Sequence, residues 1–391
     1  MTVASSFADL NLAAAAAWSA LPIGHVPEVL VGFDGFVDHI IEVVDKRTSP
    51  TAYRRVDTLS AFGAKVSAAS GRSAGFGCVT TITKLGGNGP IMANALCAQG
   101  AAVVVVGNLG EATLDPVFQG LARKARRIIS LGAPSVTSAL EFDDGKLMLN
   151  FPEPMNNVRW EVLLDRCGGL DEVKKLYRTA QGVTSVNWSQ TQGMTEIIRR
   201  IATEVLPGLR SDRPRWFVDL SDPNRRPAED VRAVMAALRQ IQAHADVILG
   251  LNENECRQMC AIYDVTFPAM VPEWVAAEHA CVALREKLGL SLVMCHLVRS
   301  SACAWAPGFA AGAGGSTSAD GFFCAKPKTT TGAGDHFNAG FFGGILAGLP
   351  LDQCLQIGGG TSGHFVRTGE SPTPVQVAAF LREQVAVAGK A

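Results

Sequence analysis

The most informative part of the chain reads Thr330-Thr331-Gly332-Ala333-Gly334-Asp335-His336-Phe337-Asn338-Ala339-Gly340-Phe341. Small residues stand directly before an apolar helical stretch, and glycine lets a backbone bend and approach a ligand closely. The amides of Gly332, Ala333 and Gly334 would face the N-terminal opening of that helix, where negative charge is favoured. Asp335 lies at the same opening and is placed to accept a proton from a substrate hydroxyl. On spacing alone, an ordinary glycine-rich turn with Asp335 as a helix N-terminal residue fits equally well.

Short apolar runs alternate with periodic helical segments over most of the chain. The expected strands cover residues 29–32, 103–106, 216–220, 247–249 and 292–295, and the expected helices cover 91–99, 117–126, 231–243, 274–288, 337–347 and 351–366. This alternation predicts an α/β fold, a doubly wound and mostly parallel sheet flanked by helices.

Two regions interrupt the alternation. Residues 53–83 are rich in Ser, Thr, Ala and Gly with short β-prone pieces, and residues 137–151 form a predicted hairpin that turns at Asp143-Asp144-Gly145. We predict a small β lid built from elements at about 40–84 and 137–155, inserted in a single domain of residues 1–391. Residues 310–318 are expected to form a loop.

Composition narrows the class of protein. The formal net charge is -1 and the pI is about 6.7, so no basic footprint for nucleic acid or an anionic membrane is present. No run has the length and purity of a membrane span. The ten cysteines show no paired metal-ligand pattern, which predicts buried free thiols and a cytoplasmic location. The alanine run Ala13–Ala17 has no basic residue before it, so a first helix is expected instead of a signal peptide.

The segment 330–341 resembles the C-terminal signature of the ribokinase-like (PfkB) carbohydrate kinase family, DTTGAGD-x-F-x-A-G-F. The resemblance implies that Asp335 is the catalytic base and that the amides of Gly332, Ala333 and Gly334 form an anion hole. It also implies nucleotide contacts for the two threonines before them, Thr330 and Thr331. Thr329 replaces the family's first Asp, which helps coordinate a monovalent cation in relatives that use one, so activation by K+ is doubtful. His336 stands where the family usually has a small residue; we expect it to face solvent, the alternative being a functional group beside Asp335.

A second family signature is a glycine pair that opens a helix and touches the sugar. Leu85-Gly86-Gly87-Asn88-Gly89-Pro90 resembles it, which implies substrate contacts for Gly87 and Asn88. An Asn side chain supplies both a donor and an acceptor to sugar hydroxyls. The family also has a sugar-binding Asp shortly after its first strand, where Asp38 is the better match and Asp34 the competitor. Either could instead be a loop or helix-capping Asp.

Two further segments resemble the nucleotide side of the family. Asn252 and Glu255 match an N-x-x-E pair, which implies a cofactor role for both and Mg2+ binding for Glu255; the alternative is a capping box. His296 follows a strand where relatives often carry a glycine-rich nucleotide contact, and it would contact phosphate or lie at the surface. Gly360 and His364 lie in a segment that resembles the family's adenine-flanking helix.

Together these matches imply an ATP-dependent phosphotransferase that moves the γ-phosphoryl group to a hydroxyl of a sugar or sugar-like molecule, with Mg2+. A nucleoside or sugar-phosphate kinase is the first alternative; for the latter, Lys65, Arg72 and Lys84 are candidate phosphate contacts, although Asn88 after the glycine pair favours an unphosphorylated acceptor. A non-catalytic nucleotide- or sugar-binding regulator is the second. Exposed lid edges also suggest a homodimer through the lid.

Overall fold

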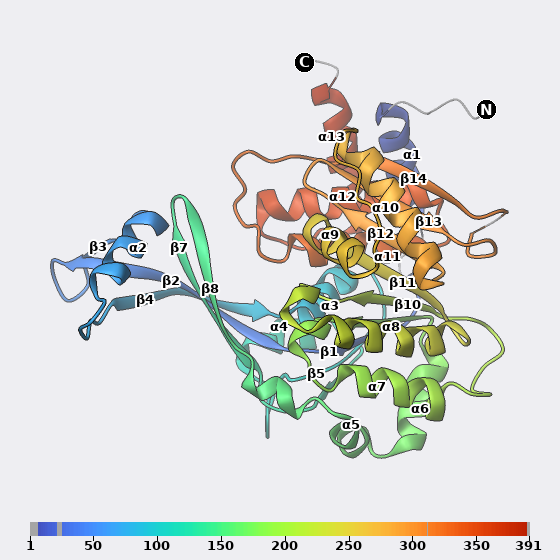
Figure 1. The fold of residues 1–391 in the computed structure, drawn as a ribbon, viewed down its shortest axis with the longest axis horizontal. Coiled ribbons are helices and arrows are strands. Elements are labelled where there is room, and N and C mark those ends of the chain that lie inside the picture. Colours follow the sequence, from blue (N-terminus) through green and yellow to red (C-terminus); the bar gives the residue numbers. More distant parts are fainter. Residues whose placement is uncertain (1–6, 22–25, 311, 389–391) are drawn as a thin grey trace.

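The computed structural model describes residues 7–21, 26–310 and 312–388, and within them the main sheet has nine strands (Figure 1). Their order across the sheet is β14-β13-β12-β11-β10-β9-β1-β5-β6, and the pairs are parallel except that β13 runs antiparallel to both of its neighbours, β12 and β14. The strands are β1 (Val29–Phe33), β5 (Val103–Gly107), β6 (Arg127–Ser130), β9 (Gly182–Val186), β10 (Arg215–Asp219), β11 (Asp246–Asn252), β12 (Leu292–His296), β13 (Ser300–Trp305) and β14 (Gly315–Asp320). The predicted α/β fold is therefore confirmed.

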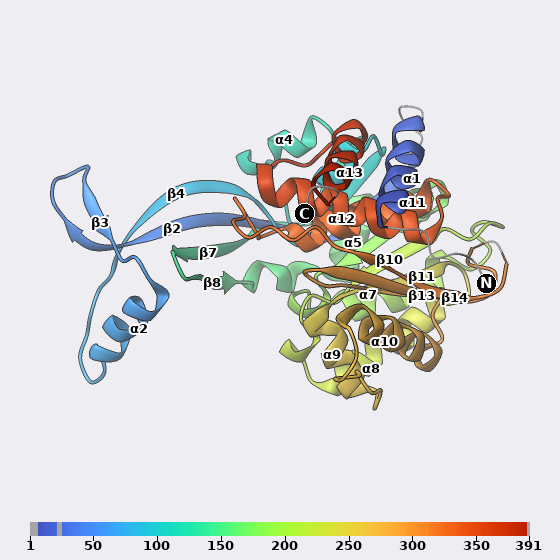
Figure 2. The ribbon, with the colours of Figure 1, turned by 90° about the horizontal axis from the view of Figure 1, so that it is seen from above.

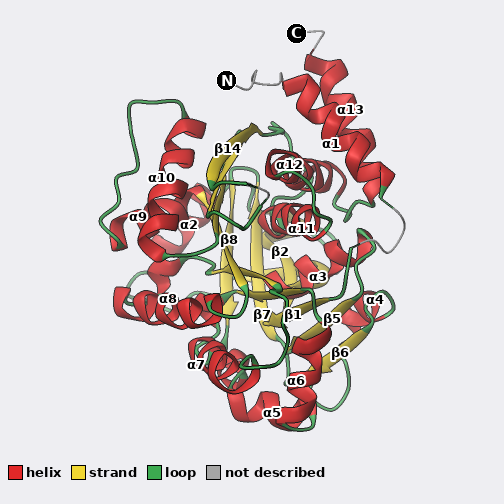
Figure 3. Ribbon diagram, turned by 90° about the vertical axis from the view of Figure 1, so that its right-hand side faces the viewer, coloured by secondary structure: helices red, strands yellow, loops and turns green. Residues whose placement is uncertain are grey.

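Helices cover both faces of this sheet (Figure 3). Successive strand residues point to opposite faces, so that Trp216 and Val218 join one apolar core while Phe217 joins the other. The first core is closed by α5 (Trp160–Cys167), α6 (Leu170–Thr179), α7 (Met194–Arg200), α8 (Ala228–Gln242), α9 (Glu253–Ile262) and α10 (Glu273–Leu288). The second is closed by α1 (Phe7–Ala20), α3 (Asn88–Ala98), α4 (Gln119–Ala122), α11 (Ala333–Leu346), α12 (Leu351–Thr368) and α13 (Pro374–Ala388).

A smaller sheet, sheet B, extends away from the main body (Figure 2). It contains β2 (Phe36–Arg47), β3 (Tyr53–Arg55), β4 (Gly77–Gly86), β7 (Ser135–Phe142) and β8 (Gly145–Phe151). The predicted hairpin is confirmed as β7 and β8, which turn between Phe142 and Gly145. Helix α2 (Leu59–Ala68) begins after Thr58, whose hydroxyl accepts from the Ala61 amide, and it packs on a small apolar cluster around Val43 and Phe142.

Three sequence predictions differ from the structure. Residues 53–83 contain the helix α2 in addition to strands, because Thr58 supplies an N-cap. The predicted helix 117–126 is reduced to α4 and a 3-10 turn, because the chain already joins β5 at Arg126. The predicted loop 310–318 contains the start of β14, where Gly315 lies against the Trp305 indole.

The remaining turns are short. They are η1 (Pro116–Phe118), η2 (Glu153–Asn157), η3 (Trp188–Gln190), η4 (Ile201–Val205) and η5 (Pro223–Arg225). In the part of the chain that the structure describes, no helix is long and apolar enough to cross a membrane. All ten cysteines are free thiols and most of them are buried, as predicted, with Cys78 exposed.

The parallel strands place polar side chains at one edge of the main sheet. Asp34 follows β1, Asn187 follows β9, Asp219 ends β10, Asn252 ends β11 and His296 ends β12. The carboxyl ends of parallel strands are where open α/β sheets bind ligands. The N-terminus of α11 faces the same edge, since Asp335 in its first turn interacts electrostatically with Asp34 and Asp219.

Candidate active site

The glycine-rich segment forms a tight turn into α11. Gly332 has a φ of 94°, a left-handed conformation that favours glycine, and a Cβ there would lie 3.2 Å from the Ile91 side chain. The Ala333 amide donates to the Thr330 carbonyl at 3.1 Å, which closes the turn. Of the three predicted anion-hole amides, that of Ala333 therefore holds the turn itself, and Gly334 follows in the open first turn of the helix.

Asp335, the predicted base, is joined directly to the glycine-pair helix. The Asn88 side-chain amide of α3 donates to Asp335 Oδ1 at 2.8 Å, across 247 residues of chain. Asp335 is buried, and burial followed by repulsion from Asp219 raises its pKa well above the usual carboxyl range. The Asn88 bond opposes that rise, because it favours the ionised form. The predicted base and one predicted substrate contact thus share a site.

Asp34 fixes the start of α3. Its carboxylate accepts from the amides of Asn88 at 2.9 Å and Gly89 at 2.7 Å, and from the Asn187 side chain at 2.8 Å. Burial nevertheless raises its pKa to about 6. Gly87 lies directly beside this carboxylate, with a φ of 88° that suits only glycine there. Asp34 is therefore placed as an anchor of the glycine-pair turn.

Asp38 lies on β2 of sheet B. A Cβ on Gly86 would overlap its carboxylate, so the first glycine of the pair leaves room for this side chain. Burial raises the pKa of Asp38, opposed chiefly by the nearby Lys84 ammonium. Lys146 of β8 is ion-paired with Glu141 at 2.7 Å and also donates to the Thr331 hydroxyl at 3.2 Å. Sheet B therefore contacts the glycine-rich segment through Lys146, a residue that the sequence did not single out.

Asp219 is a second residue that sequence reasoning passed over as a site residue. Its carboxylate accepts from the Ser221 amide at 2.8 Å and from the Asn338 side chain at 2.9 Å. Burial raises its pKa to about 6. Its position at the end of a buried strand was the available signal, but its partner Asn338 lies on α11, far away in sequence.

Glu255 forms the capping box that the sequence offered as an alternative. Its two carboxylate oxygens accept from the amides of Asp222 and Asn252, both at 2.9 Å, and the Asn252 side chain accepts from the Glu255 amide. Burial, then repulsion from Asp219, raises the pKa of Glu255 to about 8. The cap does not exclude a cation, because each carboxylate oxygen has a second lone pair.

Four carboxylates are thus buried at this edge, and among the described residues none of them forms a salt bridge: Asp34, Asp219, Glu255 and Asp335. Uncompensated carboxylate oxygens are the ligands that Mg2+ prefers, and Mg2+ needs few of them because it keeps several waters. No group of three or more metal-ligating side chains is preformed in the described residues. The site fits a hydrated ion held by one carboxylate.

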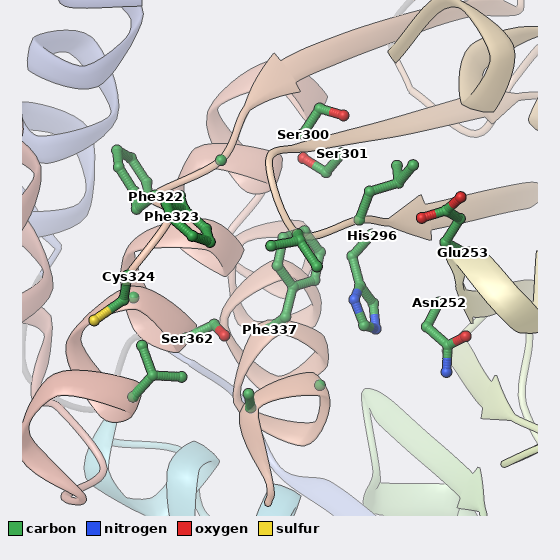
Figure 4. Close-up of a pocket in the computed structure, with 18 of the residues that line it drawn as sticks. Asn252, Glu253, His296, Ser300, Ser301, Phe322, Phe323, Cys324, Phe337 and Ser362 are labelled. Atoms are coloured by element: carbon green, nitrogen blue, oxygen red, sulfur yellow. The ribbon is translucent and has the colours of Figure 1, made fainter. Parts of the chain in front are cut away.

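A cavity of about 570 Å³ lies beside the α11 N-terminus (Figure 4). Of the predicted cofactor contacts, Asn252, His296 and Thr330 line it together with Ala333 and Gly334. The His296 imidazole stacks on Phe337 with ring centroids 5.0 Å apart, and burial lowers its pKa to about 4, so it is neutral at pH 7. Figure 4 shows Phe322, Phe323 and Cys324 at the end of the cavity opposite Asn252. A largely apolar cavity next to buried carboxylates suits a nucleotide.

Four predicted cofactor contacts do not line this cavity, namely Glu255, described above, and Thr331, Gly360 and His364. Gly360 faces Val377 and Leu381 of α13, and His364 lines a separate surface cavity. The residues of α12 that line the cavity are Gly359, Ser362, Gly363 and Val366, whose spacing follows one face of the helix. Thr331 contacts Lys146 and lines a different cavity, between sheet B, α3 and α12.

His336 does not face solvent, so that prediction is wrong. It is 2% exposed, and its ring stacks on Phe365 with centroids 3.6 Å apart and an interplanar angle of 12°. The first turn of α11 packs against α3 and α12, which leaves no solvent-facing side at this position.

Comparison with known proteins agrees with this arrangement. A family model described as prokaryotic ketohexokinase matches residues 10–384. The chain belongs to this family. A ketohexokinase of Haloferax volcanii is 30% identical over 355 residues, which cover 90% of each chain.

Solved structures share the fold at low identity. Arabidopsis thaliana ribokinase, complexed with ribose and ATP, is 17% identical with a TM-score of 0.60, over 91% of this chain and 98% of its own. Thermotoga maritima ribokinase is 15% identical with a TM-score of 0.59, over 91% and 99%. A putative ribokinase II of E. coli in complex with ATP and Mg2+ is 12% identical with a TM-score of 0.58, over 91% and 99%.

The resemblance drawn from the sequence is therefore confirmed. This family member is an ATP-dependent carbohydrate kinase with the ribokinase fold, and ATP and Mg2+ are its expected co-substrate and cofactor. The nucleoside kinase, sugar-phosphate kinase and non-catalytic regulator considered above are not favoured.

Proposed function

We propose that this protein is a ketohexokinase, which moves the γ-phosphoryl group of ATP to a hydroxyl of a ketohexose. Its family and its 30% identity to a ketohexokinase over nine tenths of both chains support the substrate class. Within the structure, the Asn88–Asp335 hydrogen bond carries the proposal. It holds the buried Asp335 carboxylate of α11 against the start of α3, the helix that opens with the glycine pair, where an acceptor hydroxyl would be held.

Asp335 takes the proton of the acceptor hydroxyl in this reaction. Asn88 binds Asp335 Oδ1 and so leaves Oδ2 for the sugar. The raised pKa of Asp335 makes it a stronger base than an exposed carboxylate, which assists proton transfer from an alcohol. The N-terminal opening of α11, with the Gly334 amide, favours the negative charge of the transferring group.

Glu255 would hold Mg2+, and the ion when bound supplies positive charge against the nucleotide phosphates. The cavity lined by Asn252, His296 and Thr330 receives the nucleotide. Sheet B acts as the lid. The Lys146 ammonium, which donates to the Thr331 hydroxyl, connects this lid to the glycine-rich segment. Closure excludes water, which otherwise competes as acceptor.

The charges on sheet B favour an acceptor without a phosphate group. Lys146 is paired with Glu141, and Lys84 is balanced by Asp38. Lys65 pairs with Asp45 at 2.7 Å at the outer end of the sheet. These three lysines are already compensated, so a sugar phosphate would find no free positive charge among them; Arg72, the remaining candidate, donates to the Ala68 carbonyl and forms no ion pair within the described residues.

The deciding experiment is a phosphate-transfer assay with fructose, ribose, adenosine and fructose 6-phosphate as acceptors, and ATP or ADP as donor. We expect turnover of fructose with ATP. In Asp335→Asn the amide oxygen can still accept the hydrogen bond from Asn88, but the general base is lost. This variant should lower kcat about 1000-fold, because general-base catalysis contributes roughly 100- to 10000-fold. Calorimetry should show fructose affinity within about 3-fold of the parent.

Glu286→Gln, a change of an exposed carboxylate on α10, is the control and should leave kcat unchanged. Absence of turnover with every acceptor would instead identify a binding protein. An Asp335→Asn variant that kept most of its activity would rule out the base.

A second copy of this chain is the proposed partner of sheet B. The outer strand β8 exposes Leu147, Leu149 and Phe151, and strand edges of this kind seek a partner. A homodimer through sheet B should appear as a mass of about twice 41.2 kDa in light scattering. Leu149→Lys should convert the dimer to a monomer, and a parent protein that is monomeric throughout would refute the dimer.

We also propose a cytoplasmic location, in line with the free thiols.

A further inference from the structure

His336 is a buried histidine next to the predicted base, and the mechanism above gives it no task. Its Nδ1 lies 2.7 Å from the Gly332 carbonyl oxygen, and its Nε2 lies 2.8 Å from the Ser371 hydroxyl. The ring stacks face to face on Phe365. A buried polar ring with both nitrogens bonded and one face covered has a single orientation.

The two bonds determine which nitrogen carries the proton. A carbonyl oxygen only accepts, so His336 Nδ1 must donate to Gly332. Burial lowers the pKa of the imidazole to about 4, so the ring is neutral and its Nε2 accepts from the Ser371 hydroxyl. The Gly332 carbonyl therefore selects the form of the ring that is protonated at Nδ1.

The bonds continue beyond Ser371 in one consistent direction. The Asn94 side-chain amide donates to the Ser371 hydroxyl at 2.9 Å, and the Lys124 ammonium donates to Asn94 Oδ1 at 3.0 Å. Every member thus donates inward, from an exposed ammonium to the Gly332 carbonyl. Such a chain polarises each bond in turn and stiffens the group at its end.

The group at that end is the peptide between Gly332 and Ala333. Its carbonyl accepts from His336 twice, through the ring and through the backbone amide at 3.1 Å, and its N–H donates to Thr330. A trans peptide is planar with its carbonyl and N–H on opposite edges, so this peptide is held from both sides. Its orientation sets the direction in which the following helix amides point.

Helix α3 is bonded to two consecutive residues of α11. Asn88 binds Asp335 directly, and Asn94, six residues later, reaches His336 through Ser371. The base and the glycine-rich turn are consequently fixed to the same helix.

We propose that His336 is a positioning residue for phosphoryl transfer, which holds the Gly332–Ala333 peptide and the first turn of α11 in the orientation that the reaction needs. The role rests on the proposed kinase function. His336 touches neither acceptor nor nucleotide; it acts through the turn.

Two substitutions by amide side chains distinguish the role of Nδ1 from that of Nε2. In His336→Asn the amide nitrogen takes the place of Nδ1 and can still donate to Gly332, whereas in His336→Gln the amide reaches the position of Nε2. We expect His336→Asn to keep kcat within about 3-fold of the parent. His336→Gln should lower kcat about 10- to 100-fold, the effect of losing one hydrogen bond at a buried site, with the fructose KM within about 3-fold.

Phe365→Leu is the control for a merely structural role, because it removes the stacking and keeps every hydrogen bond. It should lower the melting temperature and leave kcat within about 3-fold. A loss of kcat that follows the loss of melting temperature across the three variants, or a His336→Gln variant with the parent kcat, would overturn the proposal.

The second measurement is independent of turnover. In 15N-labelled protein, the histidine signal that disappears in His336→Asn should be that of a neutral ring protonated at Nδ1, and Ser371→Ala should shift it. An Nε2-protonated ring would overturn the proposal. Failure of the proposed function would appear differently, as a parent protein that phosphorylates no sugar while this signal is present, and it would remove the catalytic role of His336 with it.

Discussion

Replacing Asp34 by Asn should change how the stability of the ligand-free protein depends on pH. Burial raises the pKa of Asp34 from 3.8 to about 6, even though three hydrogen bonds favour its ionised form. In the unfolded chain this carboxyl ionises first, so its contribution to stability is fully present below about pH 4 and is lost as the pH rises through 6.

The size of the effect follows from the shift. One pKa unit corresponds to 1.36 kcal/mol, so the full loss is about 3 kcal/mol, of which about 2 kcal/mol falls between pH 4.5 and 6.5. A chain of 391 residues has an unfolding entropy of roughly 0.8 kcal/mol per kelvin, so the expected change in melting temperature is about 2 °C.

Thermal unfolding of the parent and of Asp34→Asn at pH 4.5 and 6.5, at equal ionic strength, measures this change in melting temperature. When the pH is raised from 4.5 to 6.5, the melting temperature of the parent should fall by about 2 °C more than that of Asp34→Asn. The hydrogen bond that Asn cannot accept costs the same at both pH values and cancels in the comparison. Asp165→Asn, a change of an exposed carboxylate on α5, should behave like the parent. Equal changes in the melting temperatures of the parent and Asp34→Asn would mean that Asp34 is exposed to water, as a sugar-binding carboxylate would be. The interpretation of Asp34 as a buried anchor would then be wrong.

Three further results are expected from the site. Asp219→Asn removes a negative charge that raises the pKa of Asp335, so the acid limb of a plot of kcat against pH should move to lower pH, and an unmoved limb would contradict the electrostatic coupling. Lys146→Met removes the contact between β8 and Thr331, and steady-state kinetics should show kcat/KM for the sugar lowered about 10-fold, the effect of about 1.4 kcal/mol, with the ATP KM unchanged. Replacing K+ by Na+ should leave kcat within about 2-fold, because Thr329 offers a hydroxyl in place of a carboxylate; a loss of more than about 10-fold would show that a K+ site exists.

The local signals in the sequence predicted the fold well. The strands around Val103–Gly107 and Leu292–His296 are continuous apolar runs, because parallel strands are buried on both faces, and such runs are visible in a sequence. The turn before α11 was visible for a similar reason, since Gly332 needs a left-handed backbone and a helix must follow it.

Contacts between distant segments explain what the sequence did not reveal. His336 read as a surface residue because its partners, Phe365 and Ser371, come about thirty residues later. Asp219 read as the end of a strand, since only folding brings α11 to it. On α12 the sequence predicted a nucleotide contact at Gly360. Neighbouring residues of a helix point about 100° apart, so Gly359 lines the cavity whereas Gly360 faces α13.

Helix α3 has a consequence for changing the acceptor of this kinase. The residues that an engineer would randomise for a new sugar, those after Gly87, stand on the helix that also holds Asp335 and, through Asn94, the turn before it. Acceptor selectivity and turnover are therefore not independent design variables here, and a library limited to the glycine-pair helix would be dominated by variants that recognise a new sugar and convert it slowly. Recombination of the whole contact unit, the start of α3 together with the first turn of α11, is the route by which both properties could change together.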